Sequence, residues 1–329
     1  MRAAIIQGFG GPERFEIVSN APKPDLHPNQ VLLRVHAAGV NPLDWKIRRG
    51  ELKYLLGANF PMILGNDVSG VIEEVGAAVT RFRPGDAVFC MLDSSPTPLC
   101  TGFAKPGAYA EYAVTREDTL ALKPQNLSHE EAASVPLAAL TAFQTLRYRA
   151  KVKQGDRVLI NGASGGVGIF AIQTARLFGA RVTAVCGDRN RDMVASLGAD
   201  DVISYQEMKL TDIEGPFDVI YDVVANSSFY QCRHMLTEKG IFISNIASPS
   251  RLLSTWLNPV CHTLGFKKSS GFAWVRPSGR DLGIISRMFE HGELRTVVDR
   301  VFPLEAVHEA HIYSEKGQAR GKIVLRVTQ

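Results

Sequence analysis

Residues 157–186, RVLINGASGGVGIFAIQTARLFGARVTAVC, decide the fold. The strand RVLIN runs into a glycine-rich turn at 161–168, and the turn opens a helix that leads to a second strand, RVTAVC. Such a unit binds a dinucleotide pyrophosphate, because glycines let the backbone approach the phosphates and helix N-terminal amides hold their charge. Gly165 and Gly168 fit the G-x-G-x-x-G pattern, whereas Ala163 stands at its first glycine. We predict a dinucleotide site; the alternative is a tight turn that binds nothing.

The pattern around this unit predicts an α/β protein with two domains. Strands and helices alternate after about residue 125: strands at 157–161, 181–186, 201–205, 217–224 and 240–246, and helices at 166–180, 191–199, 228–240 and 280–294. This alternation indicates a doubly wound parallel sheet, the Rossmann fold. Short runs with period-two alternation at 30–40, 68–76 and 86–92, separated by proline and glycine turns, indicate a β-rich domain before it.

Two helices are expected at the change between the domains. Ser128 and Glu131 form a capping box at the start of a helical stretch, and Pro136 divides that stretch. The tail is expected to form a strand at 296–302, a helix at 304–315 and a last strand at 321–327.

Composition excludes several classes of partner. The 329 residues are 45% hydrophobic and 21% charged, with a net charge of +4 and no basic block, so nucleic acid is not an expected partner. The most apolar loop, TWLNPVCHTLGF at 255–266, is interrupted by polar residues and proline, so no membrane span is expected. The N-terminus reads as a strand and a turn, and the five cysteines form no CxxC pair. We therefore expect a cytoplasmic protein.

The loop after RVTAVC indicates which nicotinamide cofactor is used. An NAD site has an acid at the end of the second strand, but Cys186 stands there. Arg189 offers a guanidinium to a 2′-phosphate, with Gly187 and Asn190 in the same loop, so we predict NADP(H). Asp188 keeps a ribose-binding alternative open.

Several motifs resemble those of one family along essentially the whole chain. They include GVNPLDWKIRRG (39–50), LGNDVSGVIEEVG (64–76), NGASGGVG (161–168) and GQARGKIVL (317–325). With them the chain resembles the medium-chain dehydrogenase/reductase superfamily, in its zinc-free quinone oxidoreductase and enone or enal reductase branch. The resemblance implies a GroES-like catalytic domain at 1–124, completed by 295–329, and a Rossmann NADP-binding domain at 125–294. It also implies a homodimer.

The same resemblance bears on the metal. Zinc-dependent relatives carry a cysteine where this chain has Asn41, and a His-Glu pair where it has Asn66 and Asp67. Asparagine is a poor zinc ligand, and Cys90 and Cys100 have the wrong spacing for a structural zinc lobe. We expect no metal. Asp67 is then a structural acid, hydrogen-bonded to loop amides or paired with a base such as Lys46 or Arg48.

A metal-free member of this family would reduce an electrophilic substrate: a quinone, enal or enone. Negative charge develops on the substrate oxygen and needs donors held in place. The loop 41–54 supplies three candidate catalytic residues. Asn41 would hydrogen-bond the substrate carbonyl or the nicotinamide ribose, Lys46 would neutralise the charge and Tyr54 would donate a proton. Alternatives stay open: a buried Asp44–Lys46 pair, an aromatic wall at Tyr54, and water as the proton source.

The resemblance also assigns contacts to the cofactor. The residues implied are Thr141, Ser164, Gly165, Gly166, Val167, Tyr205, Asn245, Ile246 and Lys322. Among the histidines, His308 and His311 lie three residues apart on an amphipathic helix and are expected to be exposed.

Three functions remain open from the sequence. The first is a zinc-independent, NADPH-dependent reductase of quinones or of the C=C bond of α,β-unsaturated carbonyls. The second is a zinc-type NAD(P)-dependent alcohol dehydrogenase. The third is an NADPH-binding protein with a non-enzymatic role. Substrate choice is expected to depend on 248–277, a segment without clear periodicity.

Overall fold

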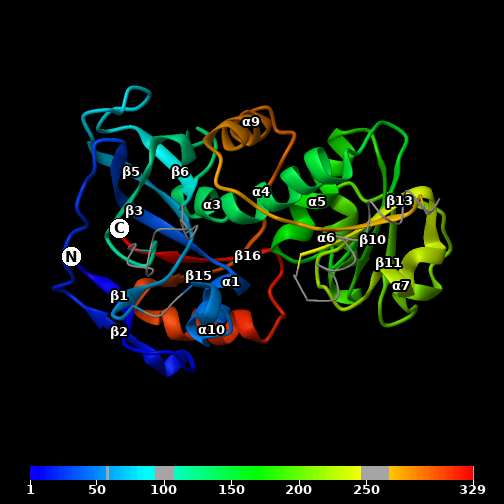
Figure 1. Ribbon diagram of the computed structural model, residues 1–329, viewed down its shortest axis with the longest axis horizontal. Helices are drawn as coiled ribbons and strands as arrows, with labels where there is room; N and C mark the ends of the chain where they lie inside the picture. The colour runs from blue at the N-terminus through cyan, green and yellow to red at the C-terminus, as the bar shows by residue number, and fades with distance from the viewer. Residues whose placement is uncertain (57–58, 93–106, 246–266, 329) are drawn as a thin grey trace. The chain divides into compact units, whose positions relative to one another are not determined.

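The computed structural model describes residues 1–56, 59–92, 107–245 and 267–328, which fall into two compact units (Figure 1). Unit 1 comprises Met1–Leu137 and Pro277–Gln329, and unit 2 comprises Ala138–Arg276. The predicted α/β class, with one β-rich and one parallel-sheet part, is confirmed.

The contacts place 125–137 and 277–294 in unit 1, whereas the sequence suggested the dinucleotide domain for them. The difference arises because α3 (His129–Ala133) packs on β3 (Gln30–Val40) and β5 (Asp67–Val75), and α9 (Gly279–Glu290) packs on β8 (Leu120–Leu122).

Unit 1 is built on a seven-stranded sheet with the order β15-β16-β3-β5-β6-β8, and β7 also pairs with β3. Its remaining strands are β6 (Ala87–Met91), β7 (Tyr112–Arg116), β15 (Val298–Pro303) and β16 (Lys322–Arg326). The last strand, β16, lies antiparallel to β3, with Ile323 opposite Val40 (red beside blue in Figure 1). This pairing brings the start of β16 beside the end of β3, which Asn41 follows directly.

Unit 1 also contains a smaller sheet, with the order β2-β1-β4, and three further short helices. Their bounds are β1 (Ala3–Ile6), β2 (Phe15–Val18), β4 (Met62–Ile63), α1 (Pro42–Arg48), α2 (Lys53–Leu56) and α10 (Val307–Glu315). Helix α4 (Pro136–Gln144) starts in unit 1 and continues into unit 2 from Ala138. The sequence indicates a loop at 41–54, but α1 forms there because Pro42 suits the first helical position and the Asp44 carboxylate accepts the backbone N–H of Asn41.

Unit 2 is a six-stranded parallel sheet with the order β11-β10-β9-β12-β13-β14. The strands are β9 (Arg157–Asn161), β10 (Arg181–Cys186), β11 (Asp201–Ser204), β12 (Phe217–Asp222), β13 (Leu236–Ser244) and β14 (Ser269–Phe272), with helices α5 (Gly166–Leu177), α6 (Arg191–Ser196) and α7 (Phe229–Cys232). The order reverses between β9 and β12, and ligands of such sheets bind at the carboxyl ends of the strands beside that switch point.

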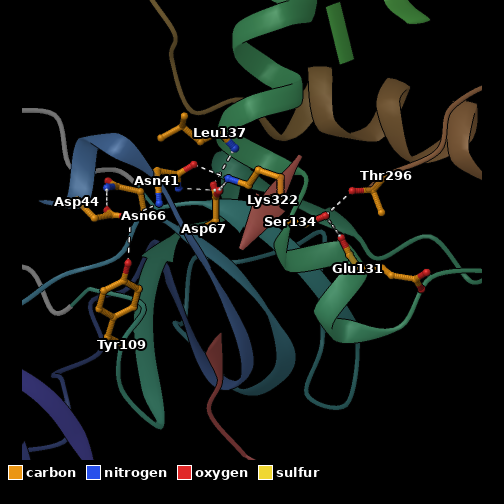
Figure 2. Close-up of polar contacts among 10 residues, drawn as sticks. All are labelled: Asn41, Asp44, Asn66, Asp67, Tyr109, Glu131, Ser134, Leu137, Thr296 and Lys322. Atoms are coloured by element: carbon orange, nitrogen blue, oxygen red, sulfur yellow. Dashed lines mark hydrogen bonds and ion pairs between the residues drawn. The ribbon is translucent and has the colours of Figure 1, made fainter. Parts of the chain in front are cut away.

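The capping box and the helix break are confirmed. The backbone N–H of Glu131 donates to Ser128 Oγ at 3.1 Å, and that of Ser128 donates to Glu131 Oε2 at 2.8 Å. A second helix, α4, then starts at Pro136. Ser134, at the end of α3, contacts Thr296 through a hydroxyl pair 2.6 Å apart (Figure 2).

The helix expected at 228–240 is wrong beyond its first turn. Only Phe229–Cys232 is α-helical, and Leu236 already pairs with Phe217 in the sheet. Leu236 is buried there, and a Cβ on Gly240 would lie 2.9 Å from the carbonyl oxygen of Phe217. Tertiary pairing therefore overrides the helical composition of this segment. Strand β14, inside the segment that showed no periodicity, was not predicted.

Two histidines stack where α3 packs on the large sheet of unit 1. The rings of His36 and His129 lie 4.3 Å apart at an interplanar angle of 16°. His129 Nδ1 is 2.8 Å from Ser69 Oγ. Burial lowers the pKa of His129 from 6.5 to about 4, helped by the nearby charges of His36 and Lys123. Burial also lowers the pKa of His36.

Folding stability should therefore fall as the pH drops from 6.5 towards 4, because the unfolded histidine takes up a proton that the folded one does not. Replacing His129 with Gln removes this titration and keeps a hydrogen-bonding side chain beside Ser69. Urea unfolding across that pH range should show a pH slope smaller by about one proton, or ~1.4 kcal/mol per pH unit. The control is His308→Gln on the exposed side of α10; equal slopes for the two variants would contradict this assignment.

Candidate active site

Asn41 follows β3 and caps α1. Its backbone N–H donates to Asp44 Oδ2 at 2.8 Å, which fixes the first helical turn. Its side-chain carboxamide is used elsewhere: Nδ2 donates to Asp67 Oδ2 at 2.9 Å, and Oδ1 accepts from the Lys322 ammonium. Asn41 is 2% exposed, so its side chain is bonded to these protein groups and not to solvent.

Asp67, the first residue of β5, is the centre of the cluster. Its Oδ1 accepts the backbone N–H of Leu137 at 2.7 Å, and its Oδ2 lies 3.3 Å from Lys322 Nζ. Figure 2 shows Asn41 and Lys322 converging on this carboxylate from two sides. Burial raises the pKa of Asp67, and the charge of Lys322 opposes that shift. A structural acid is what the sequence indicated.

The partner of Asp67 differs from both bases that the sequence suggested. Neither Lys46 nor Arg48 reaches it; the ion pair forms with Lys322, which lies 255 residues later in the chain. Lys322 starts β16, and the antiparallel pairing of β16 with β3 brings it beside Asn41. The sequence had linked Lys322 only to the cofactor, and that contact stays a prediction.

Asp44 is a second buried carboxylate, held by neutral donors. Asn66 Nδ2 donates to its Oδ1 at 2.8 Å, and the Tyr109 hydroxyl donates to its Oδ2 at 3.1 Å (Figure 2). Burial raises its pKa from 3.8 to about 6, although the bonds from Asn41, Asn66 and Tyr109 oppose the shift. The Asp44–Lys46 pair considered from the sequence does not form, since the Lys46 ammonium lies over the Trp45 ring, 5.5 Å from its centroid.

His311 extends the cluster and is buried, so the expectation that it is exposed is wrong. On α10 it shares the inward face with Val307 and Ala310, while His308 is exposed. Its Nδ1 accepts from Arg48 Nε at 3.4 Å, and its Nε2 is 3.2 Å from the Tyr109 hydroxyl. Burial, with the charge of Arg48, lowers the pKa of His311 to about 3.

These bonds fix the direction of a buried chain of donors. Arg48 can only donate, so His311 carries its proton on Nε2 and donates it to Tyr109, whose hydroxyl donates to Asp44. The chain starts at a guanidinium that pairs with Glu315 and does not deprotonate in proteins. It therefore orients Asp44 and cannot supply it with protons.

The other two catalytic candidates lie outside the cluster. Tyr54 is 94% exposed, with the Lys53 ammonium 5.0 Å from its ring centroid. Lys46 is only partly buried, on α1. The structure brings Asn41 together with Asp67 and Lys322, and the catalytic roles of Lys46 and Tyr54 stay predictions without a geometric argument.

The donor set around Asp67 does not suit zinc. It consists of one carboxylate, one carboxamide and an ammonium, and the oxygens of Asn41 and Asp67 that face a cation already hold Lys322. In the described parts of the chain, no group of three or more His, Cys, Asp or Glu side chains could hold a metal ion. Cys100 lies outside the described residues.

The glycine-rich turn of unit 2 has one tight and one open position. A Cβ on Gly168 would lie 2.2 Å from the carbonyl oxygen of Gly162, so helix and turn are packed tightly there. A Cβ on Gly165 would meet only that oxygen, at 3.5 Å. Ser164, Gly165, Gly166 and Val167 are partly exposed at the start of α5. The backbone of the turn is thus open at Gly165, and its contact with a phosphate stays a prediction.

One glycine of this turn was missed. Gly162 has φ +83°, and a Cβ there would lie 2.4 Å from Val224 Cγ2. Gly162 therefore adopts the left-handed backbone conformation of the turn, and the next residue, Ala163, is buried. The doublet Asn161-Gly162, at the end of a strand, was the available signal.

The loop after β10 holds a buried acceptor that lacks a donor. Asn190 Nδ2 donates to Ser164 Oγ at 3.1 Å, but Asn190 Oδ1 is buried with no hydrogen-bond partner among the described residues. An unmet buried acceptor is costly and fits a ligand hydroxyl. Arg189 and Asp188 are exposed in the same loop.

An aromatic side chain lies against this loop. Tyr205 is 64% exposed, and a Cβ on Gly187 would lie 2.8 Å from its hydroxyl. Together with the open glycines and the unmet Asn190 acceptor, these features fit a dinucleotide.

The carboxyl ends of β12 and β13 carry polar groups that the sequence analysis only partly identified. Asp222 was missed: it is buried and accepts from Asn161 Nδ2 at 2.8 Å and from the Ser227 hydroxyl at 2.6 Å. Asn245 Oδ1 accepts from the Tyr221 hydroxyl at 2.7 Å. Thr141 is buried on α4. Ile246 and most of 248–277 lie outside the described residues.

Comparisons with known proteins agree with this architecture. One family model, described as an alcohol dehydrogenase GroES-like domain, matches residues 27–125, and another, described as a zinc-binding dehydrogenase, matches 197–325. The human NAD(P)H oxidoreductase RTN4IP1, mitochondrial, is 35% identical over 99% of this chain and 89% of its own. The quinone-oxidoreductase homolog, chloroplastic, of Spinacia oleracea is 34% identical over 99% and 98%. The solved quinone oxidoreductase of Coxiella burnetii has a TM-score of 0.86 and 33% identity, covering 100% and 99%.

These names correct one expectation. The prediction of a cytoplasmic protein is wrong by this comparison, since the human relative is named mitochondrial and the spinach relative chloroplastic. Within the described residues, no helix has the length and apolar character needed to cross a membrane.

The two glycine positions should respond differently to alanine. Gly165→Ala should leave the free energy of unfolding nearly unchanged but weaken binding of the dinucleotide by roughly tenfold or more, because its methyl group enters the open space over the turn. Gly168→Ala should destabilise the protein by about 1–3 kcal/mol, because its methyl group meets backbone. Urea unfolding and NADPH fluorescence titration measure the two effects. Destabilisation by Gly165→Ala would contradict the assignment.

Proposed function

Because this chain belongs to the medium-chain dehydrogenase/reductase superfamily, we propose that it is a zinc-independent, NADPH-dependent reductase of quinones or of the C=C bond of α,β-unsaturated carbonyls. The broader class, an oxidoreductase with a nicotinamide cofactor, follows from that membership. The observation that carries the finer proposal is the Lys322 ammonium, bonded to Asn41 and Asp67 where zinc relatives need metal ligands.

The cofactor is proposed to be NADPH. No acid ends β10, and Arg189 is exposed in the loop that follows it. Asp188 is the competing candidate for binding the ribose. Its Oδ1 lies 3.8 Å from Nε of Arg191, the first residue of α6, so its carboxylate already has a basic neighbour. The residues proposed to hold the cofactor are Thr141, Ser164, Gly165, Gly166, Val167, Gly187, Arg189, Asn190, Tyr205, Asn245 and Ile246.

When bound, NADPH supplies a hydride to the electrophilic carbon of the substrate. The part of this chain in the reaction is to hold the substrate oxygen as it gains negative charge. Asn41 Nδ2 donates one N–H to Asp67 Oδ2, and its second N–H has no hydrogen-bond partner among the described residues. That second N–H is proposed to bind the substrate oxygen, with Asp67 holding the carboxamide of Asn41 and Asp44 holding its backbone N–H.

Two other functions lead to different observations. A zinc-type alcohol dehydrogenase needs a Lewis acid to stabilise an alkoxide, and metal analysis of the purified protein would find stoichiometric zinc. A non-enzymatic NADPH-binding role would give tight binding without turnover. A homodimer, implied by resemblance, stays a prediction.

A substrate screen tests the proposal. NADPH oxidation, followed by its absorbance, should occur with at least one member of a panel of quinones, short enals and cyclic enones. Simple alcohols with NADP⁺ should give no reduction of the cofactor, because the proposed site has no Lewis acid to stabilise the alkoxide that alcohol oxidation requires. Turnover of alcohols by zinc-containing protein, or tight NADPH binding with no turnover on any panel member, would overturn it.

Cofactor choice has its own test. Replacing Arg189 with Ala should raise the KM for NADPH roughly 10- to 100-fold, the loss expected for charge-assisted hydrogen bonds, and leave that for NADH nearly unchanged. Arg181→Ala is the matched control, because Arg181 is exposed at the opposite, amino end of β10 and pairs with Asp201. Equal losses of both cofactors in Arg189→Ala would show that this side chain does not read the 2′-phosphate.

A further inference from the structure

Lys322 has a donor left over. An ammonium carries three N–H groups, and two of them are directed to Asn41 Oδ1 and Asp67 Oδ2. Lys322 is only 3% exposed, and the third N–H has no hydrogen-bond partner among the described residues. A buried, charged donor without a partner is unfavourable, so this N–H is expected to meet a ligand.

The spare donor does not stand alone. Asn41 Nδ2 also has one N–H without a described partner, and both nitrogens bind the same oxygen, Asp67 Oδ2. Two donors that share one acceptor lie close together. They form a pair of hydrogen-bond donors, one cationic and one neutral, of the kind that stabilises an oxyanion.

Resting on the proposed function, we propose that Lys322 is a catalytic residue that donates its third N–H to the carbonyl oxygen of the quinone, enal or enone. The substrate carbon gains a hydride with its electron pair from the cofactor, and the C=C–C=O electrons shift onto the oxygen. That oxygen takes the Lys322 proton, which gives an enol. The enol from an enal or enone tautomerises to the saturated carbonyl, whereas the enol from a quinone passes a proton from the hydride-bearing ring carbon, through water, to the second carbonyl oxygen and so becomes the hydroquinone. The Lys322 amine then regains a proton from water, and Asp67 stays ionised throughout.

A purely structural role for Lys322 has to be separated from this one. Asp67 is buried, and removing its cation leaves an uncompensated carboxylate, so Lys322→Met alone is expected to lower stability whichever role holds. The double variant Asp67→Asn/Lys322→Met removes both charges and keeps the size of both side chains. It therefore restores the charge balance of the cluster without restoring the donor.

The two roles give opposite results in the double variant. If Lys322 only compensates Asp67, both the melting temperature and kcat recover. If Lys322 donates to the substrate, the melting temperature and the Kd for NADPH recover, while kcat stays lower by roughly 10²- to 10³-fold, the usual loss of an oxyanion donor. The second outcome is expected. The control Lys316→Met, an exposed lysine six residues earlier, should leave all three values unchanged.

A binding measurement tests the donor without turnover. In the presence of NADP⁺, 4-nitrophenol is an oxyanion probe whose colour reports its ionisation. The wild-type protein should lower the apparent pKa of the bound phenol by about one unit, because an ammonium beside it favours the phenolate. The double variant should produce no such shift, and an equal shift in both proteins would overturn the proposal.

Turnover by the wild-type protein and by the double variant distinguishes failure of the proposed function from failure of the proposed role of Lys322. If the wild-type protein turns over no quinone, enal or enone, the proposed function fails, whatever the phenol titration shows. If the wild-type protein is active and the double variant recovers its kcat, the function stands and the role of Lys322 is refuted.

Discussion

The Asp67 carboxylate is the constraint on which the buried cluster of Asn41, Asp67 and Lys322 depends. A carboxylate with no access to water must receive hydrogen bonds or a counter-charge. Asp67 receives both, from Asn41 at the start of α1, from the Leu137 backbone near the start of α4 and from Lys322 at the start of β16. Three segments far apart in the sequence are thus joined at one residue, and each is placed by its own secondary structure.

The second buried carboxylate shows how the surroundings set the behaviour of chemically identical groups. Asp67 has an ammonium beside it, while Asp44 is held by amides and a phenol, and its pKa is raised to about 6. The donor chain that reaches Asp44 begins at Arg48 and cannot pass on a proton. Asp44 is therefore suited to orienting Asn41 and Asn66, whereas the cationic donor of the cluster is at Lys322.

The sequence predicted local features well and distant ones poorly. The βαβ unit, strand β3 and the capping box of Ser128 follow from periodicity and turn residues within a short window. The Asp67–Lys322 pair does not, because it spans 255 residues and depends on the register of β16 against β3. His311 was misjudged for a related reason: the helical pattern of α10 is weakly amphipathic, and only the contact with Tyr109 and Arg48 identifies its buried side.

In the proposed reaction an ammonium takes the place of a metal, and an ammonium stabilises only those oxyanions whose basicity it can match. A lysine ammonium ordinarily has a pKa of about 10.4 and a phenol about 10, so a proton passes between them at little cost in free energy. A simple alkoxide is far more basic, close to hydroxide, and a metal is the usual means of stabilising it near neutral pH. A cluster built on Lys322 is therefore suited to substrates whose conjugation already spreads the negative charge, as in a hydroquinone or an enol. This match in basicity is the physical reason for proposing quinones and conjugated carbonyls as the substrates.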